Sequence, residues 1–216
     1  MAKDKLSLAA WIEESEKKGI SLRETLIANN AEAMGVEPQV LLDEMADMLK
    51  VMRASIDYGL TGVRSRSKLT GGSAKKLFEA KQSNNYANLL GSTVSDAVIF
   101  SLAVAEANAA MGRIVAAPTA GASGVLPGML FSLQKNYALS EKDLAAGLVV
   151  AGSIGLVIAN RSSLSGAMGG CQAETGSAAA MAAGAAVDML GGTPEQVGHA
   201  VAMTIKNMLG LVCDPV

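Results

Sequence analysis

The sequence predicts an almost entirely α-helical fold. Half of its 216 residues are hydrophobic, yet only 3% are aromatic, so Ala, Gly, Met and Leu must build the core. Alanine has the highest helix propensity, whereas strands favour β-branched and aromatic side chains. We therefore expect an all-α, multi-helix domain with a buried Ala/Gly-rich central helix, Gly-rich loops and no sheet of three or more strands.

Three helices are expected in the first 60 residues. Ser7 caps a helix over residues 7–18, and a capping box at Ser21 and Glu24 opens a second that ends near Met34. A third helix starts at Pro38 and runs to about Tyr58, because proline is well tolerated at a helix start. Its apolar side chains recur at helical spacing: Val40, Leu41, Met45, Met48, Leu49 and Met52. These helices are moderately charged and are interpreted as a peripheral layer.

The remaining helices alternate with glycine-rich segments. Ser92 or Thr93 is expected to cap a strongly apolar helix that Gly112 ends, and Thr193 with Gln196 forms a capping box for the last helix. The expected helices cover residues 73–82, 94–111, 141–159, 173–190 and 194–208, together with one that ends near Tyr137. The organisation predicted is one helical domain over residues 1–216.

Charge and hydropathy exclude several classes of protein. The net charge of −2 argues against a nucleic-acid surface. The uncharged run 144–160 contains five Gly, Ser or Asn residues and falls short of the roughly 18 apolar residues needed to span a bilayer. No signal peptide is evident at the N-terminus. We expect a cytoplasmic protein without a membrane segment, whose two cysteines are thiols or metal ligands rather than a disulfide.

The cysteines Cys171 and Cys213 are the first candidates for chemistry. Their spacing alone favours two buried core residues, because cysteine is a common small core residue. Gly169, Gly170 and Gly176 leave room around Cys171, however, as a bulky inorganic cofactor would need. Thiolates are the usual ligands of iron–sulfur clusters, so a cluster is the alternative interpretation.

Two glycine-rich loops are candidates for binding an anion. Residues 117–124 precede a helix whose N-terminus would attract a carboxylate or phosphate, although an ordinary tight connection fits equally well. Residues 67–72 supply a lysine, two hydroxyls and two glycines, although composition favours a flexible surface loop. His199 is interpreted as an ordinary, partly buried helical residue.

Five motifs in order carry a resemblance to a known family. They are SKLTGG, APTAGASGVLPG, SGAMGGCQAETGSAAAMAAG, LGGTPEQV and NMLGLVCDPV, between Ser65 and Val216. Together they resemble the α chain of iron–sulfur-dependent bacterial L-serine dehydratase. The resemblance implies a [4Fe–4S] cluster held by three cysteines with one open iron. Two of these ligands would be Cys171 and Cys213, and the third would lie beyond Val216.

The same resemblance implies the reaction and the partners. L-serine would be converted to pyruvate and ammonia, with the open iron acting as a Lewis acid on the departing hydroxyl. Thr119, Gly121 and Ser123 fall in the loop that holds substrate, and Ser67, Lys68 and Thr70 are further candidates. A β chain and assembly into an oligomer are implied. Residues 61–216 would be a catalytic core incomplete at its C-terminus and inactive alone, and the base that removes the Cα proton stays open.

Two alternatives belong to other classes. A pyridoxal-phosphate-dependent dehydratase would use Lys68 as the Schiff-base lysine and the glycines as a phosphate cup, although the expected strand-rich core is missing from the pattern. The chain could also be a non-catalytic helical subunit that only binds a partner. Absorbance spectra and metal analysis separate these alternatives from the iron–sulfur enzyme.

Overall fold

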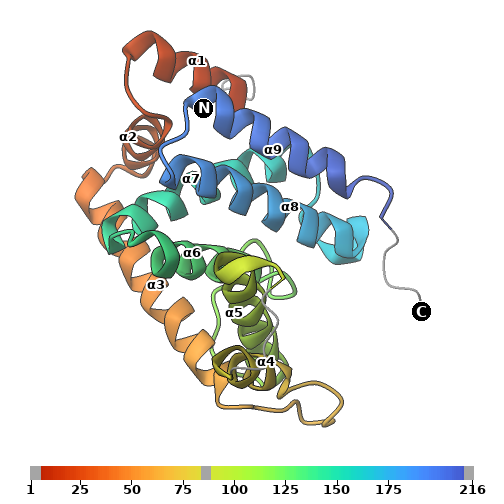
Figure 1. Ribbon diagram of the computed structural model, residues 1–216. Helices are drawn as coiled ribbons and strands as arrows, with labels where there is room; N and C mark the ends of the chain where they lie inside the picture. The colour runs from red at the N-terminus through yellow and green to blue at the C-terminus, as the bar shows by residue number, and fades with distance from the viewer. Residues whose placement is uncertain (1–5, 84–88, 212–216) are drawn as a thin grey trace. The chain divides into compact units, whose positions relative to one another are not determined.

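The computed structural model describes residues 6–83 and 89–211, and in this part of the chain α-helices are joined by loops (Figure 1). No strand occurs among these residues apart from an isolated bridge between Arg64 and Gly71. The prediction of an all-α fold is confirmed. The helices are α1 Leu8–Lys18, α2 Leu22–Met34, α3 Pro38–Leu60, α4 Ser73–Gln82, α5 Gly91–Ala109, α6 Val125–Tyr137, α7 Glu141–Arg161, α8 Gly166–Met189 and α9 Pro194–Met208.

Three of the predicted helix starts have the expected caps. Ser7 accepts a hydrogen bond from the backbone of Ala10 at the start of α1. Reciprocal capping boxes open α2, at Ser21, and α9, at Thr193. Each box satisfies backbone N–H groups that lack a partner inside the helix. The local sequence therefore predicted the starts of α1, α2 and α9 correctly.

The predicted start of α5 and the apolar face of α3 were partly wrong. Helix α5 begins at Gly91, after Leu90 in the N-cap position, and no side chain caps it, so Ser92 and Thr93 lie inside the helix. On α3, Leu41, Leu49 and Met52 are buried, whereas Val40 and Met48 are exposed. The buried residues follow one narrow stripe of the helix surface, and Val40 and Met48 lie outside it.

The chain divides into two compact units. The first unit is Met1–Ala46 with Glu141–Val216, and the second unit is Asp47–Ser140. The boundary in sequence between the two units, after Ala46, falls within helix α3. The boundary expected near residue 60, between a peripheral layer and a core, does not coincide with this division. The expectation of a single domain stays a prediction.

In the first unit, the Ala/Gly-rich helix α8 packs against both α7 and α9 (Figure 1). None of the residues 177–189 is exposed. A Cβ atom on Gly184 would lie 2.3 Å from Ile154 Cδ1, so the absence of a side chain permits this close approach. The predicted buried central helix is confirmed for this segment, while Thr175 in the preceding turn is exposed.

Helix α7 lies beside it and is also largely internal. Among the described residues it is the one helix long and apolar enough to cross a membrane, and 61% of its most apolar window is buried inside the protein. Its buried residues run without a break from Leu144 to Ala151. A core helix accounts for this burial, as expected for residues 144–160.

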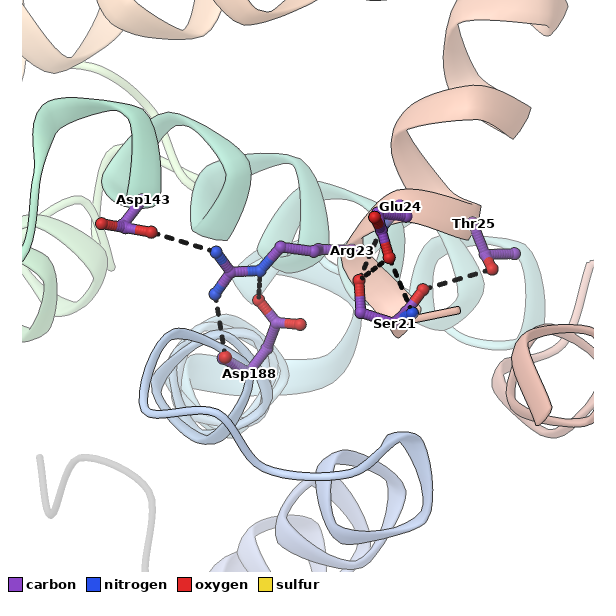
Figure 2. Close-up of polar contacts among 6 residues, drawn as sticks. All are labelled: Ser21, Arg23, Glu24, Thr25, Asp143 and Asp188. Carbon is purple, nitrogen blue, oxygen red and sulfur yellow. Dashed lines mark hydrogen bonds and ion pairs between the residues drawn. The ribbon is translucent and has the colours of Figure 1, made fainter. Parts of the chain in front are cut away.

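An arginine joins three helices of the first unit, although no pattern in the sequence indicated this contact. Figure 2 shows Arg23 of α2 between Asp143 of α7 and Asp188 of α8. Its Nε and one terminal nitrogen donate to Asp188 Oδ2 and to the Asp188 carbonyl at 2.9 and 2.8 Å, and the other reaches Asp143 Oδ1 at 3.2 Å. Asp188 is 4% exposed, and its burial raises the carboxyl pKa even though Arg23 opposes that shift.

Replacing Arg23 with methionine should lower the free energy of unfolding by about 3–5 kcal/mol, because it leaves the buried Asp188 carboxylate without its charge partner. Asp188→Asn should cost only about 1 kcal/mol, since a neutral amide oxygen still accepts from Arg23. Urea unfolding measures both changes. Lys17→Met, which removes an exposed ion pair with Glu13, is the control and should have little effect.

The raised pKa of Asp188 also determines how the difference in stability between the wild type and Asp188→Asn depends on pH. A carboxyl whose folded pKa is raised binds its proton more tightly in the folded state. Its contribution to stability is therefore complete below the unfolded pKa and is lost as the pH rises through the folded pKa. The stability of the wild type relative to Asp188→Asn should fall with rising pH across that window. A relative stability that rises instead would contradict the assignment.

Candidate substrate and cofactor sites

The loop 117–124 connects α5 to α6 in the second unit and contains two buried hydroxyls without partners. Thr119 Oγ1 and Ser123 Oγ have no hydrogen-bond partner among the residues that the structure describes, and Ser123 is 1% exposed. Buried polar atoms are almost always paired, so each of these hydroxyls needs an explanation. Gly121 lies at an exposed position between them. The loop thus has the groups of a ligand site that the protein alone does not satisfy.

The start of helix α6 follows this loop directly. Gly124 occupies the N-cap position and supplies no side-chain hydrogen bond to the first turn. The N-terminus of a helix carries partial positive charge and attracts anions. Asn108 of α5 fixes the loop by donating from Nδ2 to the Ala120 carbonyl at 3.1 Å. The expected arrangement of a short ordered loop before a helix is therefore present.

The second candidate loop forms a tight hairpin over residues 64–71, which we call the hairpin. The backbone N–H of Ser65 donates to the Thr70 carbonyl at 2.8 Å, and the Lys68 N–H donates to the Ser65 carbonyl at 2.9 Å. Ser67, Lys68 and Thr70 are all exposed on it. Lys68 has a positive φ of 63°, which is uncommon for a residue other than glycine. The loop that composition suggested was flexible has a defined hydrogen-bonded turn.

Glu106 holds the end of this hairpin and was missed by the sequence reasoning. Its carboxylate accepts hydrogen bonds from the backbone N–H groups of Gly72, Ser73 and Ala74 at 2.9, 2.8 and 3.3 Å. The donors at the start of α4 are therefore already used by the protein. The side chains of Ser67, Lys68 and Thr70 are what the hairpin offers to a ligand.

Asp96, the other charged residue of α5, holds a structural cluster in the second unit. The Nζ atoms of Lys81 and Lys135 lie 2.6 and 3.0 Å from Asp96 Oδ1, and Asn136 donates to Oδ2 at 3.2 Å. Burial alone would raise the pKa of Asp96, but these hydrogen bonds together lower it. Two acidic residues in an otherwise apolar helix were the sequence signal for both Asp96 and Glu106.

Cys171 lies inside α8 rather than in a loop before a helix that starts at residue 173. A first helical turn begins at Gly166, where Ser165 accepts from the Ala167 N–H. Gly170 then interrupts the helix with φ 74° and ψ 177°, and Cys171 opens the longer segment that follows. Cys171 is exposed. Cys171 therefore lies at the N-terminus of this longer segment, and the thiolate is the form of cysteine that binds metals.

Helix α9 returns to the same end of α8 in the first unit. Gln172 Nε2 donates a hydrogen bond to the carbonyl of Leu211. This contact joins the residue after Cys171 to a residue two positions before Cys213. Cys213 itself lies outside the described residues, so its predicted role as a ligand stays a prediction. Within residues 6–83 and 89–211, no group of three His, Cys, Asp or Glu side chains forms a metal site.

A mainly apolar cavity of about 530 Å³ lies beside this end of α8. Gly169, Gln172 and Gly176 contribute to its wall, together with residues of α1, α7 and α9. Cys171 belongs to the first unit, whereas Thr119 and Gly121 belong to the second unit. His199 is exposed on α9, where its Nε2 lies 3.9 Å from Glu195 Oε1, rather than partly buried.

The comparisons with known proteins identify a family. The profile of the family described as "Serine dehydratase alpha chain" matches residues 17–216. The chain is 46% identical over 205 residues to the probable L-serine dehydratase, alpha chain, of Bacillus subtilis, covering 95% of this chain and 68% of that protein. It is 37% identical over 206 residues to the L-serine dehydratase, alpha chain, of Peptoniphilus asaccharolyticus, covering 95% and 70%.

A longer relative matches over the same part. The L-serine dehydratase of Streptomyces coelicolor is 35% identical over 207 residues, which are 94% of this chain and 44% of that protein. The fold and the candidate sites thus define a class of protein. Its members are all-α chains with a glycine-rich loop before a helix and a cysteine at a helical kink. The chain belongs to the serine dehydratase α-chain family.

Proposed function

We propose that this chain is the catalytic α subunit of an L-serine dehydratase, a lyase that converts L-serine to pyruvate and ammonia together with a β chain. Family membership and the names of the relatives support the reaction and the partner. Within the structure, the unpaired buried hydroxyls of Thr119 and Ser123 are the observation that carries the proposal. A small polar substrate gives them the partners that the protein lacks.

The substrate carboxylate is assigned to the loop 117–124. The hydroxyls of Thr119 and Ser123 donate to its oxygens, and the start of α6 adds favourable partial charge. The corresponding donors at the start of α4 already bind Glu106, so they do not compete. Lys68 and the hairpin hydroxyls belong to the same unit and provide further polar contacts.

The residues around Cys171 fit one corner of an iron–sulfur cluster. The side chain is exposed, it lies at the N-terminus of the longer helical segment, and the neighbouring glycines leave space. The family match extends to residue 216 and so includes Cys213, the proposed second ligand of a [4Fe–4S] cluster. When bound, such a cluster supplies an iron Lewis acid that helps the serine hydroxyl to leave.

The alternative of a pyridoxal-phosphate enzyme receives less support. The described residues contain no sheet, and Lys68 is exposed on the hairpin rather than enclosed in a pocket. A subunit that only binds a partner would have no use for two buried hydroxyls without partners. Both alternatives predict no cluster-dependent turnover of serine by the complex.

The proposed function is tested with the full-length α chain and its β chain, purified together without oxygen. L-serine should yield pyruvate and ammonia in equal amounts, and D-serine should not. Ser123→Ala should lower kcat/KM for L-serine about 10- to 100-fold, since a hydrogen bond to a charged group contributes about 1.5–3 kcal/mol.

Ser132→Ala is the matched control for Ser123→Ala. Ser132 is also buried, but its hydroxyl donates to the Met129 carbonyl within α6 at 2.8 Å. This variant should leave KM for L-serine unchanged. Equal effects of the two substitutions would show that the Ser123 hydroxyl makes no specific contact with substrate. A complex that forms no pyruvate would contradict the proposed function itself.

A further inference from the structure

A carboxylate from α5 takes the place of a local cap on α4. The N-cap residue of α4 is Gly72, which has no side chain to bind the first N–H groups. Glu106 is 3% exposed and accepts from three successive N–H groups instead. A serine or aspartate at the N-cap is the usual solution, and it comes from the same segment. Here the cap connects α4 to a different helix.

Glu106 binds the backbone directly after Gly71, the last residue of the hairpin. Gly71 pairs with Arg64, and a Cβ atom on Gly71 would lie 2.2 Å from the Val63 carbonyl oxygen, with φ at +128°. Residue 71 must therefore be glycine, and its neighbour Gly72 also has positive φ. Glycine is flexible by itself, so an outside anchor is needed to hold this backbone in one conformation.

The same turn of α5 holds both candidate binding loops. Glu106 binds the base of the hairpin, and Asn108, two residues later, binds the Ala120 carbonyl in the loop 117–124. The two loops are therefore fixed to one helix within one unit. A change at Glu106 alters the hairpin without touching the contact made by Asn108.

We propose that Glu106 is a positioning residue for substrate binding, which holds the hairpin so that Ser67, Lys68 and Thr70 face the substrate in one fixed conformation. The inference rests on the proposed function, because it assigns the hairpin to the serine site. A second consequence follows from the charge. The Glu106 carboxylate fills the positive end of α4, so this helix N-terminus is not open to the substrate carboxylate.

The first test measures the hairpin without any enzyme assay. Arg64, Arg66 and Lys68 are trypsin sites on the hairpin. Glu106→Gln keeps the shape of the side chain but removes the charge that three N–H groups share. In the full-length complex, cleavage at these sites, followed by mass spectrometry, should become about tenfold faster or more. Glu79→Gln, an exposed glutamate on α4, is the control and should not change the rate.

The second test measures substrate binding in the same complex. Glu106→Gln should raise KM for L-serine about tenfold or more and change kcat less, since the loss concerns binding rather than the chemical step. Ser65→Ala loosens the hairpin from inside, because Ser65 Oγ accepts from the Thr70 N–H at 3.2 Å. It should reproduce the same rise in KM while leaving Glu106 intact, and it serves if Glu106→Gln does not fold.

The outcomes distinguish this inference from the proposed function. A wild-type complex that does not convert serine refutes the proposed function, whatever the protease shows. A wild-type complex that does convert serine, with faster cleavage but unchanged KM in both variants, makes Glu106 a structural anchor only and refutes the positioning role. Unchanged cleavage and unchanged KM refute both parts of the inference.

Discussion

Replacing Ala180 with arginine should remove the protein from the soluble fraction. Ala180 is 0% exposed in the middle of α8, which packs against α7 and α9. A guanidinium at this position would be buried without a partner, and such a charge costs several kcal/mol. The stability of a typical domain is only about 5–15 kcal/mol, and the added volume must also displace neighbouring side chains.

Ala202→Arg on α9 is the matched control for this substitution. Ala202 is exposed, so the same change adds a charge to the surface and should leave solubility and thermal melting nearly unchanged. Soluble expression and circular dichroism compare the two variants. A soluble Ala180→Arg protein with a native melting curve would show that α8 is not the centre of the core.

In the full-length α chain paired with its β chain, Cys171→Ala should abolish bound iron and serine turnover together. Alanine offers no metal-binding group in place of the thiolate, and the described residues contain no cluster of three His, Cys, Asp or Glu side chains that could hold the metal instead. Cys213→Ala should have the same effect. Since Cys171 is exposed, its replacement by alanine should leave the helical core intact, which thermal melting checks.

Met168→Ala tests whether any change at this end of α8 has the same result. Met168 is exposed in the first turn, close to Cys171 in sequence, and carries no thiolate. It should keep normal iron content and pyruvate formation. A folded Cys171→Ala complex with normal iron content and normal serine turnover would show that this cysteine is not a ligand.

Local signals in the sequence predicted most of the helices. Each capping box, at Ser21 and at Thr193, depends on two residues that lie three positions apart. A short segment of sequence is therefore enough to predict where the helix starts. Helix α5 has no such cap, and its start at Gly91 was accordingly misplaced. The Gly170 kink was missed for a related reason: glycine permits many conformations, and packing selects one of them.

The ion pairs and the anchor of the hairpin depend on partners distant in sequence. Arg23 contacts Asp188, which lies 165 positions away in the sequence, and Glu106 contacts Gly72, which lies 34 positions away. A single sequence shows that a charged residue interrupts an apolar helix, but not which group it contacts. The glycines of the two candidate loops indicated segments between helices, which the structure shows, while their roles in binding stay predictions. The structure added the two hydroxyls that have no partner among the described residues.

The absorbance spectrum of the anaerobic full-length complex, recorded before and after addition of L-serine, tests the central claim most directly. An iron–sulfur lyase should show a broad iron–sulfur band in the visible region and should form pyruvate once serine is added. The band and the pyruvate should both be missing from the Cys171→Ala complex. A sharper aldimine band, or pyruvate formation by a complex without iron, would contradict the account.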